Sequence, residues 1–318
     1  MSDDRQPKPS PIPAWIRLLR PAQWMKNVVV PAAYLFARWD PSQTANTRGW
    51  EAIIRVGLAT LCFCLLSSGV YIMNDLRDRA SDRLHPLKRL RPLAAGEIRP
   101  ATGGAISAAL AAVSLGMAAL WLPRPFLAVL GGYALMQVAY TFFLKRFSYV
   151  DVFVISFGFV LRAVAGATAI TVRISPWLLL CTFLLSLFLA LCKRRHEKIL
   201  LDAGGTGHRE ALSGYDDKVL DIQIAVIAGA TLVCYAIYTL SEETAARFGT
   251  HNLGLTIPFV LFGIFRYLEL VYRHEEGGRP EKVLLTDPMM IVTVLCYLLT
   301  ILGVFLMLPH AAEVTLPR

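Results

Sequence analysis

The sequence predicts an all-α, polytopic membrane protein with nine transmembrane helices. Of its 318 residues, 55% are hydrophobic and only 17% are charged, and the mean hydropathy is +0.51. These values exclude an ordinary soluble globular protein. Apolar segments of bilayer-spanning length recur along the chain, and no strand-like alternation competes with them. They lie near residues 25–39, 51–73, 102–122, 125–144, 150–171, 176–193, 218–240, 253–272 and 288–308.

The chain begins with a polar, proline-rich stretch that lacks the apolar core of a signal peptide. We therefore expect residues 1–14 to form a disordered cytoplasmic tail and residues 15–318 to form a single membrane domain that holds all nine helices. The six cysteines lie in or beside apolar segments, without the spacing of zinc ligands. We expect them to be reduced packing residues.

The net charge of +9 arises mainly in the loops on one side of the predicted helices. Most of the 32 Lys and Arg residues fall in the N-terminal segment and in the loops after the second, fourth, sixth and eighth spans. The positive-inside rule places this side and the N-terminus in the cytoplasm. The sequence shows no basic groove interleaved with aromatic residues, the pattern that would indicate nucleic-acid binding. The charge therefore indicates contact with the bilayer and with anionic substrates.

An acidic motif follows the second span directly, where a membrane helix meets water. If this stretch is helical, Asp75, Asp78 and Asp82 share one face, and Asn74 lies one turn before Asp78. Such hard oxygen ligands suit Mg²⁺. The cations that follow could hold phosphates bridged by that metal: Arg83, Lys88, Arg89 and Arg91. The pattern predicts a Mg²⁺–diphosphate site at a membrane surface; the alternative is an ordinary solvated charged loop.

Further candidates lie where other spans begin or end on the same side. Lys26 and Asn27 open the first span and could contact an anion, or Lys26 could be only an interfacial anchor. Lys145, shortly after Tyr140, could reach a diphosphate or snorkel to the interface.

Two charged groups mark the fifth and sixth spans. Arg162 lies well inside the fifth span, where ionised residues usually face a polar interior, and we interpret it as a site cation. Asp151 is eleven residues away, so we expect each to have a different partner. Lys193 and Glu197, at i and i+4, predict a helix-surface ion pair; with Arg194 they could instead form a second phosphate-binding pole.

The acidic motif carries a resemblance to a known family. Asn74-Asp75-x-x-Asp78-x-x-x-Asp82, followed by Arg91-Pro92-Leu93-x-x-Gly96-x-Ile98, resembles the first aspartate-rich motif of the UbiA superfamily of intramembrane prenyltransferases. The resemblance implies nine helices around a central polar cavity open to lipid, with Mg²⁺ as the cofactor held by this motif.

Other segments resemble one branch of that family. The second aspartate-rich motif is missing, and Lys193-Arg194-x-x-Glu197 stands in its place. Together with Arg20-Pro21-x-Gln23-Trp24-x-Lys26-Asn27 and His85-Pro86-x-Lys88-Arg89-x-Arg91-Pro92, this resembles decaprenyl-phosphate phosphoribosyltransferases. The resemblance implies transfer of 5-phosphoribose from phosphoribosyl diphosphate (PRPP) to a polyprenyl phosphate, for a lipid-linked arabinose donor used in cell-wall synthesis.

The resemblance also implies roles for individual residues. The metal would be held by Asn74, Asp75, Asp78 and Asp82, the three aspartates being catalytic. Substrate phosphates or their surroundings would be contacted by Lys26, Asn27, Lys88, Arg91, Tyr140, Lys145, Arg162, Lys193, Arg194 and Glu197. The expected location is the bacterial inner membrane, and assembly into a homo-oligomer is left open. The alternatives are prenyl transfer to an aromatic acceptor and a non-enzymatic polyprenyl-lipid carrier.

Overall fold

The computed structural model describes residues 12–84, 88–202, 214–273, 278, 283 and 285–307. These residues contain helices and no strand. Eight helices are long and apolar enough to cross a membrane, which confirms the all-α membrane class. They are α4 (Trp50–Arg77), α6 (Pro100–Trp121), α7 (Arg124–Phe142), α8 (Val150–Ala169), α9 (Pro176–Asp202), α10 (Asp217–Leu240), α12 (Ile257–Arg273, preceded by the 3-10 helix η6, Asn252–Thr256) and α14 (Pro288–Leu306).

The first predicted span, 25–39, is broken into short pieces. α1 (Ala14–Leu19) is followed by the 3-10 helix η1 (Pro21–Val28) and then by α2 (Val29–Arg38). The predicted span itself is divided where η1 passes into α2 at Val29, and α2 has only ten residues. α1 is separated from η1 by Arg20, whose backbone is left-handed at φ 52° and ψ 56°, and by Pro21, which lacks an N–H. Among the described residues eight helices therefore have spanning length, and the ninth span stays a prediction.

The remaining described elements are short. They are η2 (Pro41–Gln43), α3 (Thr44–Thr47), α5 (Arg79–Leu84), η3 (Lys88–Leu90), η4 (Leu144–Arg146) and α11 (Glu242–Phe248). Residues 1–11 of the predicted tail, His85-Pro86 and residues 203–213 lie outside the described part of the chain. α1 begins at Ala14, the last residue of the expected tail.

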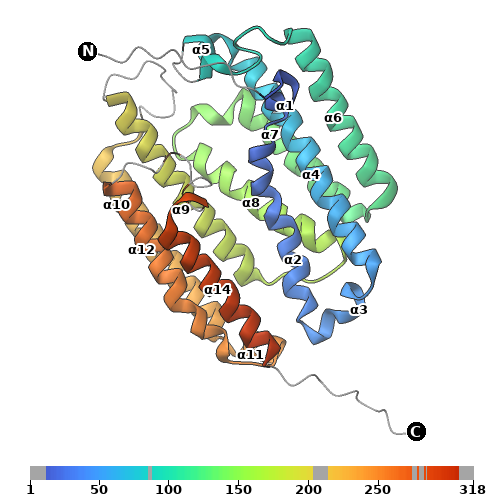
Figure 1. The fold of residues 1–318 in the computed structure, drawn as a ribbon, viewed down its shortest axis with the longest axis vertical. Coiled ribbons are helices and arrows are strands. Elements are labelled where there is room, and N and C mark those ends of the chain that lie inside the picture. The colour runs from blue at the N-terminus through green and yellow to red at the C-terminus, as the bar shows by residue number, and fades with distance from the viewer. Residues whose placement is uncertain are drawn as a thin grey trace.

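Figure 1 shows the helices in two neighbouring groups. α2 packs against α4 and α8, and α4 packs along α6. α9 joins this group to α10, and α12 packs against α14. α1, α5 and the C-terminal end of α4 lie together at one end of the bundle, and α11 lies at the other (Figure 1). Gly166 permits the close approach of α8 to α2, because a Cβ there would lie 1.9 Å from the carbonyl oxygen of Val30.

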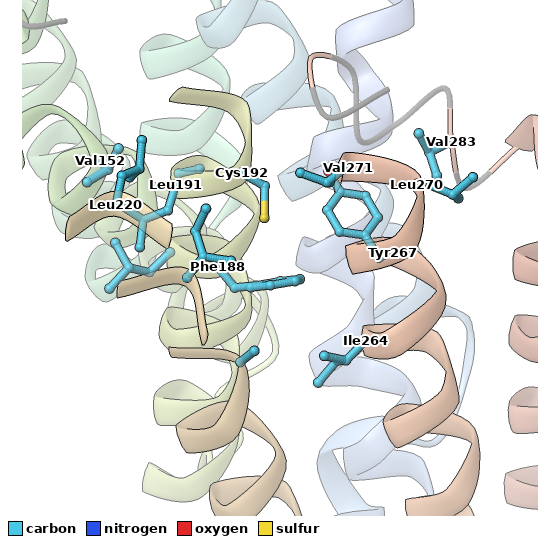
Figure 2. Packing of buried hydrophobic residues seen from close by; sticks show 14 of the residues in the cluster. Val152, Phe188, Leu191, Cys192, Leu220, Ile264, Tyr267, Leu270, Val271 and Val283 are labelled. Carbon is cyan, nitrogen blue, oxygen red and sulfur yellow. The ribbon is translucent and has the colours of Figure 1, made fainter. Parts of the chain in front are cut away.

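Two apolar cores hold these groups together. The first includes Phe63, Phe126 and Ala165, and the second includes Val152, Phe188 and other residues shown in Figure 2. α8 contributes to both, Val152 near one end and Ala165 near the other. The two groups are thus joined along a shared helix. All six cysteines are free, four of them buried and two partly buried.

Candidate functional site

The acidic motif lies across a turn between two helices. α4 ends at Arg77, Asp78 caps it with φ −91° and ψ 4°, and α5 begins at Arg79. Helical hydrogen bonds continue on both sides of the turn, since the Asp78 N–H donates to Asn74 and the Asp82 N–H donates to Asp78. Asp75 and Asp82 are each only 3% exposed. The single continuous helix expected from the spacing is therefore interrupted at Asp78.

Asp75 and Asp82 converge on one arginine. Arg91 Nη1 lies 3.0 Å from Asp75 Oδ1 and 2.7 Å from Asp82 Oδ2. Arg20 Nη2 also donates to both oxygens of Asp75, at 2.5 and 2.6 Å, and its guanidinium lies over the ring of Tyr71. These charge-assisted contacts are strong because both partners are ionised.

Asn74 and Asp78 form a second pair. Lys145 Nζ lies 3.1 Å from Asn74 Oδ1 and 2.5 Å from Asp78 Oδ1. Lys145 is held on η4, the short 3-10 helix between α7 and α8, and its side chain is 17% exposed. Lys145 thus contacts the acidic motif itself, and the expectation that it reaches a diphosphate stays a prediction.

The side-chain oxygens of this motif could bind a hard cation, and they lie in two pairs: Asp75 with Asp82, and Asn74 with Asp78. Within the described ranges, no three His, Cys, Asp or Glu residues gather closely enough to surround one metal ion. Each pair nevertheless directs oxygens from two residues at one positively charged nitrogen, at 2.5–3.1 Å. Mg²⁺ is commonly held by one or two carboxylates together with substrate phosphates and water. The donor set therefore fits Mg²⁺ when a diphosphate supplies further ligands.

A second polar cluster lies inside the membrane part of the bundle. Arg162 is 5% exposed and donates to Asn27 Oδ1 at 2.8 Å, to the Gly158 carbonyl at 2.9 Å and to the Tyr133 hydroxyl at 2.8 Å. Asn27 in turn contacts Ser67 on α4. Among the contacts of the described residues, no carboxylate lies within ion-pair distance of Arg162. An ion at this depth is costly unless it serves a polar partner.

A third cluster lies where α8 meets α9. Arg194 is 1% exposed; its Nε lies 2.8 Å from Asp151 Oδ2, and its Nη1 contacts Glu197. The Tyr215 hydroxyl donates to Asp151 Oδ1 at 2.8 Å. Burial, followed by the neighbouring Asp151, raises the pKa of Tyr215, so this hydroxyl keeps its proton. Asp151 and Arg162 have different partners, as expected.

The predicted site residues thus fall into three groups. Asn74, Asp75, Asp78, Asp82, Arg91 and Lys145 meet at the membrane surface; Asn27 and Arg162 meet inside the bundle; Arg194 and Glu197 meet on α9. Lys193 lies 4.0 Å from Glu197, which confirms the i, i+4 ion pair. Tyr140 lies near Arg194. Lys26 is partly buried on η1, and Lys88 is exposed on η3.

Sequence reasoning missed three residues in these clusters. Arg20 belongs to a segment that carried the family resemblance, but it was interpretable as an interfacial anchor and was not named as a site residue. Tyr133 and Tyr215 carried no signal, because tyrosines in or near apolar segments are usually packing or interfacial residues. Each of the three contacts its partner across more than 25 residues of sequence.

Known proteins resemble this chain along most of its length. Residues 42–197 match the UbiA prenyltransferase family. The chain is 34% identical to a decaprenyl-phosphate phosphoribosyltransferase of Corynebacterium glutamicum, over 96% of this chain and 90% of the relative. It is 32% identical to the enzyme of that name from Mycolicibacterium smegmatis, over 95% of this chain and 96% of the relative.

Solved structures share the fold. A UbiA homolog from Archaeoglobus fulgidus bound to DMAPP and Mg²⁺ superimposes with a TM-score of 0.67, covering 93% of this chain and 100% of the other, at 20% identity. A digeranylgeranylglyceryl phosphate synthase superimposes with a TM-score of 0.63 at 16% identity, covering 91% of this chain and 98% of the other. At these identities the likeness shows the common fold alone.

Proposed function

Because the chain belongs to the UbiA prenyltransferase family, we propose that it transfers 5-phosphoribose from PRPP to decaprenyl phosphate or a similar polyprenyl phosphate, with Mg²⁺ as cofactor. The observation that carries the proposal is the similarity to decaprenyl-phosphate phosphoribosyltransferases along almost the whole chain. The product would serve as a precursor of a lipid-linked arabinose donor for the cell wall.

The acidic motif suits the donor half of this reaction. The C1–O bond of PRPP breaks with oxocarbenium character, so catalysis depends mainly on stabilising the leaving diphosphate. Bound by the motif's oxygens, Mg²⁺ would neutralise negative charge on that diphosphate. Arg20, Arg91 and Lys145, which now neutralise the acids, would then turn to phosphate oxygens. Arginine is well suited to this role because its planar fork binds phosphate in a bidentate manner.

Together with the cations around the motif, Arg162 inside the bundle suits a second polyanion. The acceptor phosphate is already ionised near neutral pH, so its attack on C1 requires no general base. Arg162 is a buried cation whose contacts are a side-chain amide, a carbonyl and a phenol. A phosphate of donor or acceptor would supply the negative charge that this guanidinium lacks. A site for two phosphorylated substrates explains this excess of positive charge better than a site for one diphosphate and an uncharged ring.

The proposed location is the cytoplasmic face of the bacterial inner membrane, with residues 15–318 as one catalytic domain. The chain is an integral, multi-pass membrane protein with eight described spanning helices. The motif, α1 and α5 share one end of the bundle (Figure 1), and most Lys and Arg residues of the loops belong to that end. The positive-inside rule supports the cytoplasmic placement.

A transfer assay on the purified protein in detergent tests the function. One arm supplies labelled PRPP with polyprenyl phosphate, and the other supplies labelled polyprenyl diphosphate with 4-hydroxybenzoate. We expect label from PRPP in the lipid phase, lost with EDTA and lowered at least about 100-fold by Asp75→Asn. Asp221→Asn, which changes an acid that pairs with Arg195 on α9, is the matched control. Label only on the aromatic product would favour ring prenylation instead.

A further inference from the structure

Gly214 and Tyr215, which lie just before α10, pack against the loop that contains Lys145. The loop, residues 143–149, joins α7 to α8. The Tyr149 N–H donates to the Tyr215 hydroxyl at 2.9 Å, and the two rings lie 4.6 Å apart. A Cβ on Gly214 would lie 2.1 Å from Ser148 Oγ and 2.9 Å from Ser148 Cβ. The backbone at Gly214 therefore lies directly against Ser148.

The loop needs such support because its last residue has an unfavourable backbone. Tyr149 has φ 65° and ψ −43°, a left-handed φ that an aromatic residue rarely adopts. Such conformations persist where surrounding contacts over-determine them, and they gather at functional sites. Here the contacts are made by Tyr215, whose hydroxyl accepts from the Tyr149 N–H and donates to Asp151 Oδ1 at 2.8 Å.

The support itself is anchored in the core. Asp151 is fully buried and Arg194 is 1% exposed, and their ion pair at 2.8 Å joins α8 to α9. Tyr215 is 2% exposed. The Tyr215 hydroxyl donates its hydrogen bond to Asp151, and a lone pair on the same oxygen accepts from the Tyr149 N–H. The hydroxyl of Tyr215 therefore connects the ion pair between α8 and α9 to the backbone of the loop.

We infer that Tyr215 and Gly214 are positioning residues, which hold the 143–149 loop so that Lys145 reaches Asn74 and Asp78. Lys145 lies four residues before Tyr149, and its Nζ contacts both acceptors. The C-terminal half of the chain, which contributes none of the motif's oxygens, therefore controls the geometry of the motif's second pair. The kinetic part of this inference rests on the proposed function.

The first test uses the chemical reactivity of Lys145 and needs no turnover. Tyr215→Phe removes the hydroxyl and keeps the ring, so the loop loses its anchor while the core stays filled. Once it no longer contacts Asp78, Lys145 should be acylated several-fold faster by a water-soluble amine reagent. The intact membrane protein is labelled, and mass spectrometry that assigns the modification to Lys145 measures the rate. Tyr272→Phe, which removes a hydroxyl bonded to Asp221 at 2.8 Å, is the control and should leave the rate unchanged. An unchanged rate in Tyr215→Phe would overturn the inference.

The second test is a double-mutant cycle in the transfer assay. Tyr215→Phe should lower kcat/KM for PRPP about tenfold, and Lys145→Met about 100-fold. The double variant should be no worse than Lys145→Met, because Tyr215 acts through Lys145. A further tenfold loss in the double variant would show independent roles and overturn the inference. If the native protein transfers no phosphoribose, the proposed function fails, and the acylation rate still decides the positioning role.

A third variant guards against a folding defect in Tyr215→Phe. Gly214→Ala introduces a Cβ against Ser148 and should reproduce both effects without touching the tyrosine. Ser148→Gly removes the two atoms that this Cβ meets, so the pair Gly214→Ala with Ser148→Gly should restore the native acylation rate. Failure of this rescue, with both proteins folded, would contradict the close packing on which the inference depends.

Discussion

Arg20 donates from one nitrogen, Nη2, to both carboxylate oxygens of Asp75, at 2.5 and 2.6 Å. The contact joins residues 55 positions apart, and it occupies the acid with the most buried side chain of the motif's three. An arginine in this position competes with any cation for the same oxygens. Arg20 therefore has two expected roles: it neutralises Asp75 before the metal arrives and contacts a phosphate afterwards.

The first prediction follows from this competition. Arg20→Met should lower kcat/KM for PRPP by about 10- to 100-fold, because a phosphate contact is lost. It should also lower the Mg²⁺ concentration needed for half-maximal activity, since the guanidinium no longer competes for Asp75. Both quantities come from transfer assays at varied Mg²⁺. Arg17→Met, which changes a neighbouring arginine paired with Glu97, is the control; an increased Mg²⁺ requirement in Arg20→Met would contradict the competition.

The second prediction concerns Arg194, which the sequence analysis placed in a possible second phosphate-binding pole. The structure buries it between Asp151 and Glu197, so its main effect should be on stability. Arg194→Met should destabilise the protein by about 3–5 kcal/mol, because the buried carboxylate of Asp151 loses its ion pair with Arg194. Thermal unfolding in detergent measures this loss, and adding Asp151→Asn should recover part of it.

Lys193 provides the matched comparison for Arg194. Its side chain is 41% exposed and lies at the outer limit of an ion pair with Glu197, and such pairs contribute little to stability. Lys193→Met should therefore leave the melting temperature within experimental error. If Arg194→Met kept the native melting temperature and raised only KM, Arg194 would be a substrate ligand and the structural interpretation would be wrong.

The acidic motif shows how far the sequence could predict this site. The spacing of Asp75 and Asp82 by seven residues placed them together, and both indeed contact Arg91. Periodicity could not reveal the turn at Asp78, because helical hydrogen bonds continue across it. As a result, Asp78 turns to Lys145 while the other two acids turn to arginines.

The partners of these acids depended on tertiary packing. Arg20 and Lys145 lie 55 and 67 residues from the acids that they contact, and no local pattern specifies such distances. The fold could be predicted more fully from the sequence, since eight of the nine apolar segments correspond to helices of spanning length. The first segment differed because it is divided between the 3-10 helix η1 and the ten-residue α2, a change in helix type that hydropathy alone does not register.

The third prediction is a pH dependence of stability at α14. Asp287 caps this helix through the Met290 N–H at 2.9 Å and contacts Arg266 Nη2 at 2.7 Å. The hydrogen bond from Arg266, with help from the backbone, lowers the pKa of Asp287 below its usual 3.8. A depressed pKa means that the carboxylate stabilises the fold fully above pH 3.8, and that this contribution is lost as the pH falls through the lower, folded-state pKa.

Two variants separate the cap from the charge. Asp287→Ala should cost about 1 kcal/mol at pH 7, because Ala cannot cap the helix. Asp287→Asn keeps a good capping residue and should cost less. The difference between native protein and Asp287→Asn, measured by thermal unfolding from pH 7 to pH 3, should shrink below pH 3.8. A difference that stayed constant over this range would exclude the charge as its source.

The fourth prediction concerns stereochemistry at C1 of the transferred ribose. Each aspartate of the motif is engaged by a cation, Asp75 and Asp82 by Arg91 and Asp78 by Lys145. Under the proposed function these acids would bind the donor's diphosphate through Mg²⁺, and the acceptor phosphate would attack C1 directly from the side opposite the leaving group. One direct displacement inverts the configuration, and NMR of the isolated product measures it against synthetic standards of both anomers. Retention would exclude a single displacement from the side opposite the diphosphate and would contradict this prediction.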